Sequence, residues 1–227
     1  KFPFGIIKSF LALTKFNPDI VVGFGGYISA PVILCAYFLR IPIVIHEQTL
    51  EAGLANKFLA RFATEICISW DSSRKYFPKN KVVLTGNPIR KLMINNKGLM
   101  IKNNLPVIYV TGGSSGSHSI NLLIEEAIKE LLEKYIVIHQ TGDAKEFNDF
   151  DRLTALKNDL PEKLQERHLL KKFVDPQEVG NILNKASLIV SRSGINTVSE
   201  LLYFQKPALL IPLPFSHNNE QLINARF

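Results

Sequence analysis

The sequence predicts an α/β fold with two doubly wound parallel-sheet domains. Short apolar runs of strand length alternate with longer segments of helical periodicity, which is the pattern of repeated βαβ units. This alternation occurs on both sides of the polar stretch Asn95–Asn104, whose composition is typical of a linker. Because 227 residues are enough for two small domains, we expect these to span 1–90 and 91–227.

In the first half, apolar runs predict strands and spaced apolar residues predict helices. The expected strands are Ile20–Val22, Ile43–Ile45, Glu65–Ile68 and Val82–Leu84. The expected helices are Pro3–Phe16, Pro31–Leu39 and Leu54–Arg61, with a short helical segment near Ser72–Phe77. Asn87-Pro88 then enforces a turn that closes this half of the chain.

The second half repeats the alternation. The expected strands are Val107–Val110, Tyr135–His139, Leu169–Val174, Ala186–Val190 and Ala208–Ile211. The expected helices are Ile120–Lys134, Gln177–Lys185 and Asn196–Phe204, and a further helix begins at Glu220. Strand ends and helix starts meet within Ser191–Asn224, and sheets of this class bind ligands at such an edge.

Charge and composition narrow the kinds of partner. The net charge of +7 and the pI near 9.4 favour an anionic partner such as a phosphate, a nucleic acid or an acidic lipid surface. The lysines are dispersed and no DNA or RNA motif occurs, so we expect no nucleic-acid binding. Cys35 and Cys67 lie in apolar segments and are expected to be reduced core residues. No Cys/His cluster predicts a metal, and no cofactor is expected.

Two apolar segments raise the question of membrane contact. Ile20–Leu39 has no charged residue, but its glycines and Pro31 favour a strand, a loop and a helix over a membrane span. The amphipathic segment Pro3–Phe16 has apolar and aromatic residues with Lys8 and Lys15 between them, and Lys1 precedes it. Its apolar surface could pack on a sheet or touch an anionic membrane, and the residues alone do not divide it between these roles.

Two glycine loops follow strands and precede helices. Gly25 and Gly26 would let backbone amides approach a phosphate, although glycine pairs are common in βα turns without a ligand. The second loop, with Gly112, Gly113 and Gly116, adds serine hydroxyls and a helix dipole and predicts a phosphate site more specifically. It matches neither the dinucleotide fingerprint nor the P-loop.

Several polar residues allow two interpretations each. His46-Glu47 at a strand end could transfer a proton or bind a hydroxyl. Alternatively, the two residues are polar because they lie in a loop and cap the next helix. Thr197-x-x-Glu200 fits a capping box. Asp149-Phe150-Asp151 resembles a metal-binding DxD, but its charged surroundings favour a solvated loop.

Three groups of residues together resemble the MurG family, the UDP-N-acetylglucosamine transferases of peptidoglycan synthesis. These groups are Gly25–Pro31 with His46-Glu47-Gln48, then Gly112–Gly116, then Ser193–Glu200 with Gln221 and Asn224-Ala225. They occur in the family's order over essentially the whole chain. The resemblance implies the two-domain GT-B fold and an inverting transfer of N-acetylglucosamine. The implied acceptor is the undecaprenyl-diphospho-muramoyl-pentapeptide (lipid I), at the inner face of the cytoplasmic membrane, with a peripheral, anionic contact to that membrane.

The resemblance also implies roles for individual residues. Glu200 would bind the ribose hydroxyls, and Gln221 and Thr49 would hold the sugar. Arg90 and Ser114 would lie at the diphosphate, and Val174 would offer its backbone to uracil. The donor site would be lined by Ile195, Asn196, Thr197, Val198 and Ser199. With this constellation we prefer the ribose role of Glu200 to the helix cap, and expect the helix dipoles and Arg90 to neutralise the diphosphate without a metal.

The sequence departs from the family pattern in informative places. Thr49 stands where the family usually has Asn, and Glu220 where several relatives carry Gln or His. The family's N-terminal glycine loop, with a histidine proposed as general base, and its last helices are missing. The first domain is therefore expected to be incomplete, and this chain alone is expected to have little transferase activity. His46 and Glu47 are the candidates for the catalytic base that remain.

Two other functions stay open. A GT-B transferase with a different lipid acceptor would share the donor residues, because acceptor residues vary most. A non-catalytic module that binds UDP-sugars would bind the donor without turning it over.

Overall fold

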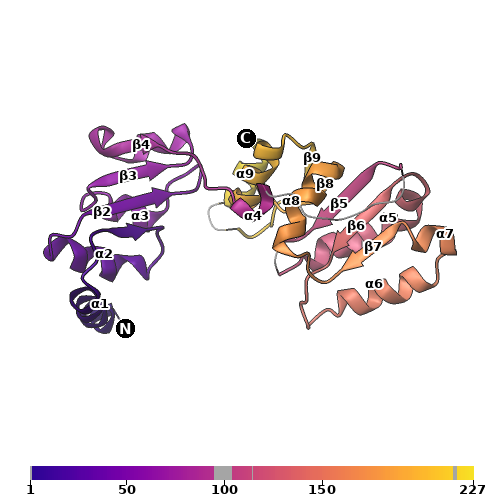
Figure 1. Cartoon of the computed structure of the whole chain (residues 1–227), viewed down its shortest axis with the longest axis horizontal. Coiled ribbons are helices and arrows are strands. Elements are labelled where there is room, and N and C mark those ends of the chain that lie inside the picture. The colour runs from indigo at the N-terminus through magenta and orange to yellow at the C-terminus, as the bar shows by residue number, and fades with distance from the viewer. Residues whose placement is uncertain (1, 95–103, 114, 217–218) are drawn as a thin grey trace. The chain divides into compact units, whose positions relative to one another are not determined.

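The computed structural model describes residues 2–94, 104–113, 115–216 and 219–227, and the expected linker Asn95–Asn104 lies almost entirely outside them. The chain divides into two compact units, Lys1–Pro88 and Ile89–Phe227. Each contains a parallel sheet, so the α/β class with two sheet-containing units is correct (Figure 1).

Unit 1 has a four-stranded parallel sheet in the order β1-β2-β3-β4. Its strands are β1 (Val21–Gly23), β2 (Ile43–Glu47), β3 (Glu65–Ile68) and β4 (Val82–Leu84). Its helices are α1 (Phe2–Phe16), α2 (Ser29–Phe38), α3 (Leu54–Leu59) and the 3-10 turns η1 (Asp71–Tyr76) and η2 (Lys79–Lys81). These match the expected elements within a few residues at the ends. β2 differs most, because it runs on through His46 and Glu47.

One core holds unit 1 together. Alternate strand residues such as Ile43, Ile45, Ile66 and Ile68 pack with Ile33 and Leu59 from α2 and α3. Cys35 is buried in this core, Cys67 is half-buried, and both are free thiols as expected. The strand residues that alternate with these core residues point to the other face of the sheet and are less buried. Val22 and Val83, for example, are about half exposed.

Unit 2 has a five-stranded parallel sheet in the order β7-β6-β5-β8-β9. Its strands are β5 (Val107–Thr111), β6 (Ile136–Gln140), β7 (His168–Lys171), β8 (Ala186–Ser191) and β9 (Ala208–Leu210). Its helices are α4 (Lys91–Ile94), α5 (His118–Lys134), α6 (Asp149–Asn158), α7 (Glu162–Gln165), α8 (Pro176–Lys185), α9 (Ile195–Phe204) and α10 (Glu220–Arg226).

Strand β5 lies at the centre and alternates between two cores. Val107 and Tyr109 pack with α8 and α9, whereas Ile108 and Val110 pack with α5 and the segment around α7. Helices therefore cover both faces of this sheet, as expected for a doubly wound domain. Because the helices lie on opposite faces, the loops after β5 and β8 lead away from each other.

One expectation about unit 2 is wrong. Asp149-Phe150-Asp151 is not a solvated loop but the first turn of α6, and Asp149 is only 5% exposed. Its carboxylate accepts hydrogen bonds from the Asn121 amide at 2.7 Å and pairs with His118 and Arg152. The segment is polar because it forms a buried network that is brought together from distant parts of the chain. In the described part of the chain, no group of three His, Cys, Asp or Glu side chains is arranged to hold a metal.

Among the described helices, none combines the length and apolarity that a crossing of the bilayer requires. Ile20–Leu39 forms β1, a loop and α2, as its glycines predict.

Candidate nucleotide-sugar site

The candidate site lies at the point where the sheet of unit 2 reverses its strand order. From central β5 the chain builds outward through β6 and β7, then returns to the other side of β5 with β8 and β9. The loops after β5 and β8 therefore start side by side but lead to helices on opposite faces. A crevice between two such loops is where sheets of this class bind ligands.

The first of these loops contains the expected phosphate glycines. Gly113 and Gly116 have φ of 85° and 80°, a conformation that other residues adopt only with strain. Gly112 has no room for a side chain, because a Cβ there would lie 2.2 Å from the Ser117 nitrogen. The loop leads directly into α5, so its backbone and the helix N-terminus face the same region. Ser114, expected at the diphosphate, lies outside the described residues.

Arg192, in the loop after β8, joins the loop after β9 to the first turn of α5. Its guanidinium donates to the carbonyls of Ile211 and Pro212, both at 3.0 Å, and to the Ser119 hydroxyl at 2.6 Å. Burial lowers the pKa of Arg192. The sequence suggested no role for this residue, because its acceptors are separated from it by up to 73 positions.

Glu200 projects from α9 and forms an ion pair with Arg90. The distance from Arg90 Nη2 to Glu200 Oε1 is 2.9 Å, and the Glu200 side chain is 17% exposed. The capping-box alternative is wrong, because Gly194 is the N-cap of α9 and Thr197 lies inside the helix. Glu200 therefore serves no helix end, and one edge of its carboxylate is held by a cation.

The other donor residues on α9 divide by face. Ile195, Val198 and Ser199 are buried, whereas Asn196 is exposed and Thr197 is half-buried. Only Asn196, Thr197 and Glu200 therefore present side chains that an incoming ligand can reach. Val174 follows β7 in a loop and is 7% exposed, with its side chain in the core, so only its backbone remains for recognition.

Gln221 is the second residue of α10 and is hydrogen-bonded to two neighbouring loops. Its Oε1 accepts from the Leu213 backbone amide at 2.9 Å, and its carbonyl accepts from the Ser193 hydroxyl at 2.7 Å. Asn224 completes the link by donating to the Ser193 carbonyl at 3.0 Å. Ser193 and Asn224 thus tie α10 to the loop after β8. Both residues belong to the motifs that resemble the MurG family, but the sequence suggested no role for either of them.

In unit 1, the Glu47 carboxylate organises the loop that follows β2. It accepts from the backbone amides of Thr49 and Gly53, both at 3.0 Å, from the Thr49 hydroxyl at 2.6 Å and from the Asn56 amide at 2.9 Å. Gly53 is the N-cap of α3, so the helix-capping interpretation of Glu47 is correct. The Thr49 hydroxyl is also close to the Glu51 carbonyl.

His46 and Glu47 lie on opposite faces of the sheet, because they are consecutive residues of β2. His46 Nε2 lies 3.2 Å from the Gly86 carbonyl, and its ring contacts Phe24 edge-on at 5.7 Å between centroids. Its Nδ1 has no hydrogen-bond partner among the described residues. The expectation that His46 and Glu47 act as a pair is therefore not supported by their geometry. Nearby, Gly25 and Gly26 have φ of 86° and 78°.

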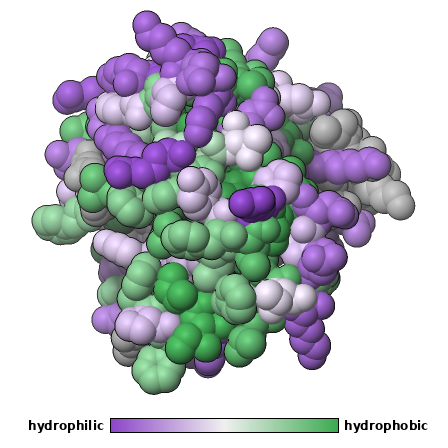
Figure 2. All heavy atoms as spheres, turned by 90° about the vertical axis from the view of Figure 1, so that its left-hand side faces the viewer, coloured by the Kyte–Doolittle hydropathy of each residue, from purple (hydrophilic) through white to green (hydrophobic). Residues whose placement is uncertain are grey.

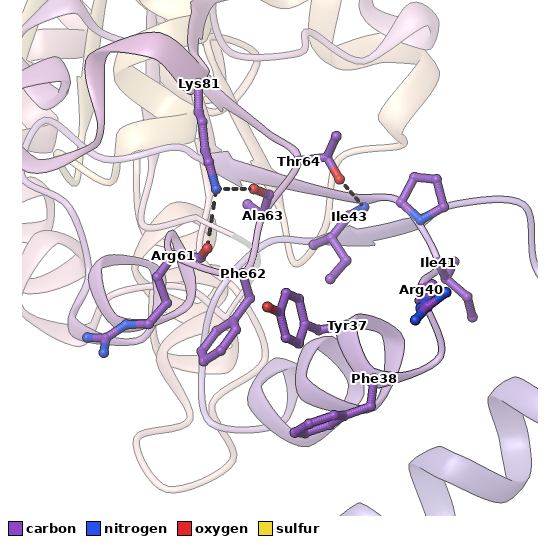
Figure 3. Close-up of a pocket in the computed structure, with 11 residues that line it drawn as sticks. Tyr37, Phe38, Arg40, Ile41, Ile43, Arg61, Phe62, Ala63, Thr64 and Lys81 are labelled. Atoms are coloured by element: carbon purple, nitrogen blue, oxygen red, sulfur yellow. Dashed lines mark hydrogen bonds between the residues drawn. The ribbon is translucent and has the colours of Figure 1, made fainter.

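A separate hollow of about 770 Å³ opens at the other end of the unit 1 sheet, where β2 and β3 begin (Figure 3). Tyr37 and Phe38 from α2 lie on one side, and Arg61 and Phe62 on another. Lys81 donates to the carbonyls of Arg61 and Ala63 at 3.2 and 2.7 Å. The hollow thus combines cations with aromatic rings.

The fold and the glycine-loop crevice define a two-unit α/β protein of the GT-B glycosyltransferase type. Residues 107–227 match the glycosyltransferase family 28 C-terminal domain, and residues 1–68 match the N-terminal domain of the same family. The chain belongs to glycosyltransferase family 28.

Curated relatives and solved structures agree with this family. A UDP-N-acetylglucosamine--N-acetylmuramyl-(pentapeptide) pyrophosphoryl-undecaprenol N-acetylglucosamine transferase of Treponema denticola is 36% identical over 98% of this chain and 59% of its own length. A Bacillus cereus protein with the same name, numbered 2, is 34% identical over 97% of this chain and 61% of its own length. The chain thus spans about three fifths of the length of these relatives.

The crystal structure of Acinetobacter baumannii MurG has a TM-score of 0.70 to this chain and is 30% identical, covering 99% of this chain and 63% of the other. A UDP-GlcNAc 2-epimerase from Neisseria meningitidis has a TM-score of 0.68 at 19% identity, covering 92% of this chain and 63% of the other. The second likeness concerns the fold alone.

Proposed function

We propose that this chain is part of an enzyme that transfers N-acetylglucosamine from UDP-N-acetylglucosamine to lipid I, forming lipid II for peptidoglycan. The observation that carries this proposal is identity of 34% and 36% to transferases of that name over nearly the whole chain. The structure supports it with a glycine loop after β5 and an acidic side chain on α9, the helix that follows the neighbouring strand β8.

Unit 2 would bind the donor. Glu200 would accept hydrogen bonds from the two ribose hydroxyls, as a carboxylate can do for a vicinal diol. Arg90 pairs with Glu200 at 2.9 Å and is 55% exposed, so its guanidinium can turn to a diphosphate at little cost. Amides of the loop after β5 and the N-terminus of α5 would stabilise the departing UDP. The sugar would lie near Gln221, beside the turn that Ser193 and Asn224 hold.

Unit 1 would face the acceptor and the membrane. His46 is the better candidate for a proton acceptor, because the oxygens of Glu47 are already occupied by four donors. The positive-φ loop at Gly25 and Gly26 would approach the acceptor diphosphate.

We place the protein peripherally on the cytoplasmic face of the plasma membrane. Helix α1 packs on α2 but leaves Phe4 72%, Leu11 61% and Phe16 81% exposed. Figure 2, in which the left-hand side of the Figure 1 view faces the reader, shows hydrophobic residues gathered over part of unit 1. Lys8 and Lys15 of α1 and the cations of the hollow beside α2 would meet anionic headgroups.

The donor and acceptor are tested separately. Calorimetry with UDP-N-acetylglucosamine should show binding to this chain, and absence of binding would contradict the donor site. In the full-length protein, radiolabelled sugar should be transferred to lipid I and not to diacylglycerol, and the reverse preference would favour a transferase with another lipid acceptor. Donor binding without transfer to either acceptor in the full-length protein would favour a non-catalytic UDP-sugar module.

The membrane contact is tested by sedimentation with vesicles. Vesicles that contain anionic phosphatidylglycerol should bind the chain, and Phe4→Ser/Leu11→Ser should weaken this binding several-fold because each removes buried apolar area. Leu202→Ser, at a residue of α9 that is 54% exposed, is the matched control. Equal binding of all three proteins would contradict the placement of this surface on the membrane.

A further inference from the structure

The turn after β6 begins with Thr141-Gly142, directly after Gln140 ends the strand, and its backbone packs against the glycine loop that follows β5. A Cβ on Gly116 would lie 2.0 Å from the Thr141 carbonyl oxygen, and one on Gly142 would lie 2.4 Å from the Gly116 Cα. Only glycines permit two backbones to approach this closely. The conformation of the glycine loop therefore depends on the turn beneath it.

Gln140 holds one specific group of the glycine loop. Its Nε2 donates to the Gly113 carbonyl at 3.1 Å, and its Oε1 accepts from the Tyr109 hydroxyl at 3.0 Å. Gln140 and Tyr109 are 7% and 3% exposed, so water does not replace these bonds. Burial raises the pKa of Tyr109 to about 12, which keeps its hydroxyl protonated as a donor at neutral pH.

This arrangement matters for an anion site because carbonyl oxygens repel phosphate and amides attract it. The Gly113 carbonyl is bound by a buried side chain, so it is turned toward the protein and not toward the crevice. At φ of 85°, Gly113 has few steric limits of its own, so hydrogen bonds keep its peptide in one orientation. The Gly113 carbonyl also accepts from the Gly116 amide at 3.2 Å, and the Gly113 amide donates to the Thr111 hydroxyl at 3.1 Å. Gln140 adds the restraint that comes from the neighbouring strand.

A second set of bonds fixes the turn itself. Asn121, on α5, donates to the Thr141 carbonyl at 3.1 Å and to Asp149 at 2.7 Å, and His139 Nε2 lies 3.0 Å from its Oδ1. The helix that follows the glycine loop is thereby joined to the turn below the loop. Both ends of the loop are therefore supported by residues from β6 and its turn.

We propose that Gln140, oriented by Tyr109, is a positioning residue that presets the glycine loop for the diphosphate of the nucleotide. It touches no ligand and acts through the Gly113 carbonyl. This inference depends on the proposed donor site, in which the loop after β5 takes the diphosphate.

The test compares UDP with uridine, which lacks the diphosphate. Gln140→Leu removes both hydrogen bonds at similar volume and should weaken UDP binding about tenfold, the effect of roughly 1.4 kcal/mol, while uridine binding stays unchanged. Tyr109→Phe leaves the bond to Gly113 in place and should have a smaller effect in the same direction. Calorimetry or ligand-observed NMR gives the ratio of the two dissociation constants.

Gln165→Leu is the matched control, because Gln165 also donates its side-chain amide to backbone carbonyls, those of Asn158 and Leu160 at 3.1 and 2.7 Å. It should lower thermal stability without changing the ratio of UDP to uridine affinity. An unchanged ratio in a folded Gln140→Leu protein, or an equal loss for both ligands, would overturn the inference while leaving the donor site intact. If the wild-type chain binds no UDP, the donor site fails and the inference fails with it.

Discussion

At the scale of the residue, Glu200 is the side chain on which the proposed donor site depends most. It lies in the second turn of α9, and its contact in the structure is the Arg90 guanidinium. An ion pair with one half-exposed partner contributes little to stability, about 1 kcal/mol or less. This leaves the carboxylate available for a ligand that offers better hydrogen bonds than a mobile side chain.

Glu200→Gln should therefore weaken UDP binding about 10- to 100-fold, because a hydrogen bond to a charged acceptor contributes about 1.5–3 kcal/mol. Binding of UDP that lacks both ribose hydroxyls should change far less, since the diol is then absent. Calorimetry with both nucleotides measures this difference. Glu125→Gln removes a similar ion pair, with Arg152 at 2.7 Å, and serves as control. Equal losses for the two nucleotides would exclude ribose recognition by Glu200.

At the scale of the element, α4 and α8 are in unusually close contact. A Cβ on Gly180 of α8 would lie 1.8 Å from the Met93 carbonyl oxygen of α4, and Met93 itself is fully buried. Arg90 immediately precedes α4, so the seating of this short helix on α8 also positions the partner of Glu200. The absence of a side chain at Gly180 thus allows the helix packing that positions Arg90.

We expect Gly180→Ala to destabilise unit 2 by about 1–3 kcal/mol, although alanine alone would favour a helix by about 1 kcal/mol. The overlap with backbone forces α4 away from α8. Urea unfolding followed by circular dichroism measures this change. Gly194→Ala is the matched control, because a Cβ there meets nothing within 4 Å, and it should change stability by less than about 1 kcal/mol. A Gly180→Ala protein as stable as the wild type would show that the two helices can separate freely.

At the scale of the molecule, two buried histidines link stability to pH. Burial, with the neighbouring His168, lowers the pKa of His139 to about 3, and burial, with Lys157, lowers that of His168 to about 4. Asn121 uses its amide hydrogens on Thr141 and Asp149, so His139 must donate from Nε2 to the remaining oxygen and keep Nδ1 unprotonated. In the described part of the chain, neither nitrogen of His168 has a partner that would stabilise a charge.

Stability should therefore be complete above the unfolded histidine pKa of about 6.5 and fall as the pH drops toward 4. Below pH 6.5 the histidines bind protons in the unfolded chain but stay neutral in the folded one. Each histidine should therefore lower the free energy of unfolding by roughly 2 kcal/mol at pH 5. Urea titrations between pH 7 and 4.5 measure this loss. The variant His168→Leu should lose stability about half as steeply, and an unchanged slope would show that His168 does not contribute.

Much of the architecture follows from local pattern alone. Apolar runs such as Val107–Val110 and Tyr135–His139 form strands within one residue of the expected bounds, because burial on both sides of a parallel sheet demands continuous apolar sequence. The glycine loops are also local, since a chain that turns sharply between a strand and a helix needs residues without side chains. From these the α/β class and the position of the candidate crevice could be predicted.

What local pattern could not provide is the partner of each polar side chain. Strand β2 is two residues longer than expected, so His46 and Glu47 point to opposite faces of the sheet. Asp149 belongs to a buried network with Asn121, and Gln140 binds Gly113, which is 27 positions away in the sequence. A buried polar group must find a hydrogen bond, but which group satisfies it depends on strand register and on chain segments that meet only in the folded protein. The sequence alone therefore determines where the strands and glycine loops lie, and the tertiary structure decides which polar groups remain free for a ligand.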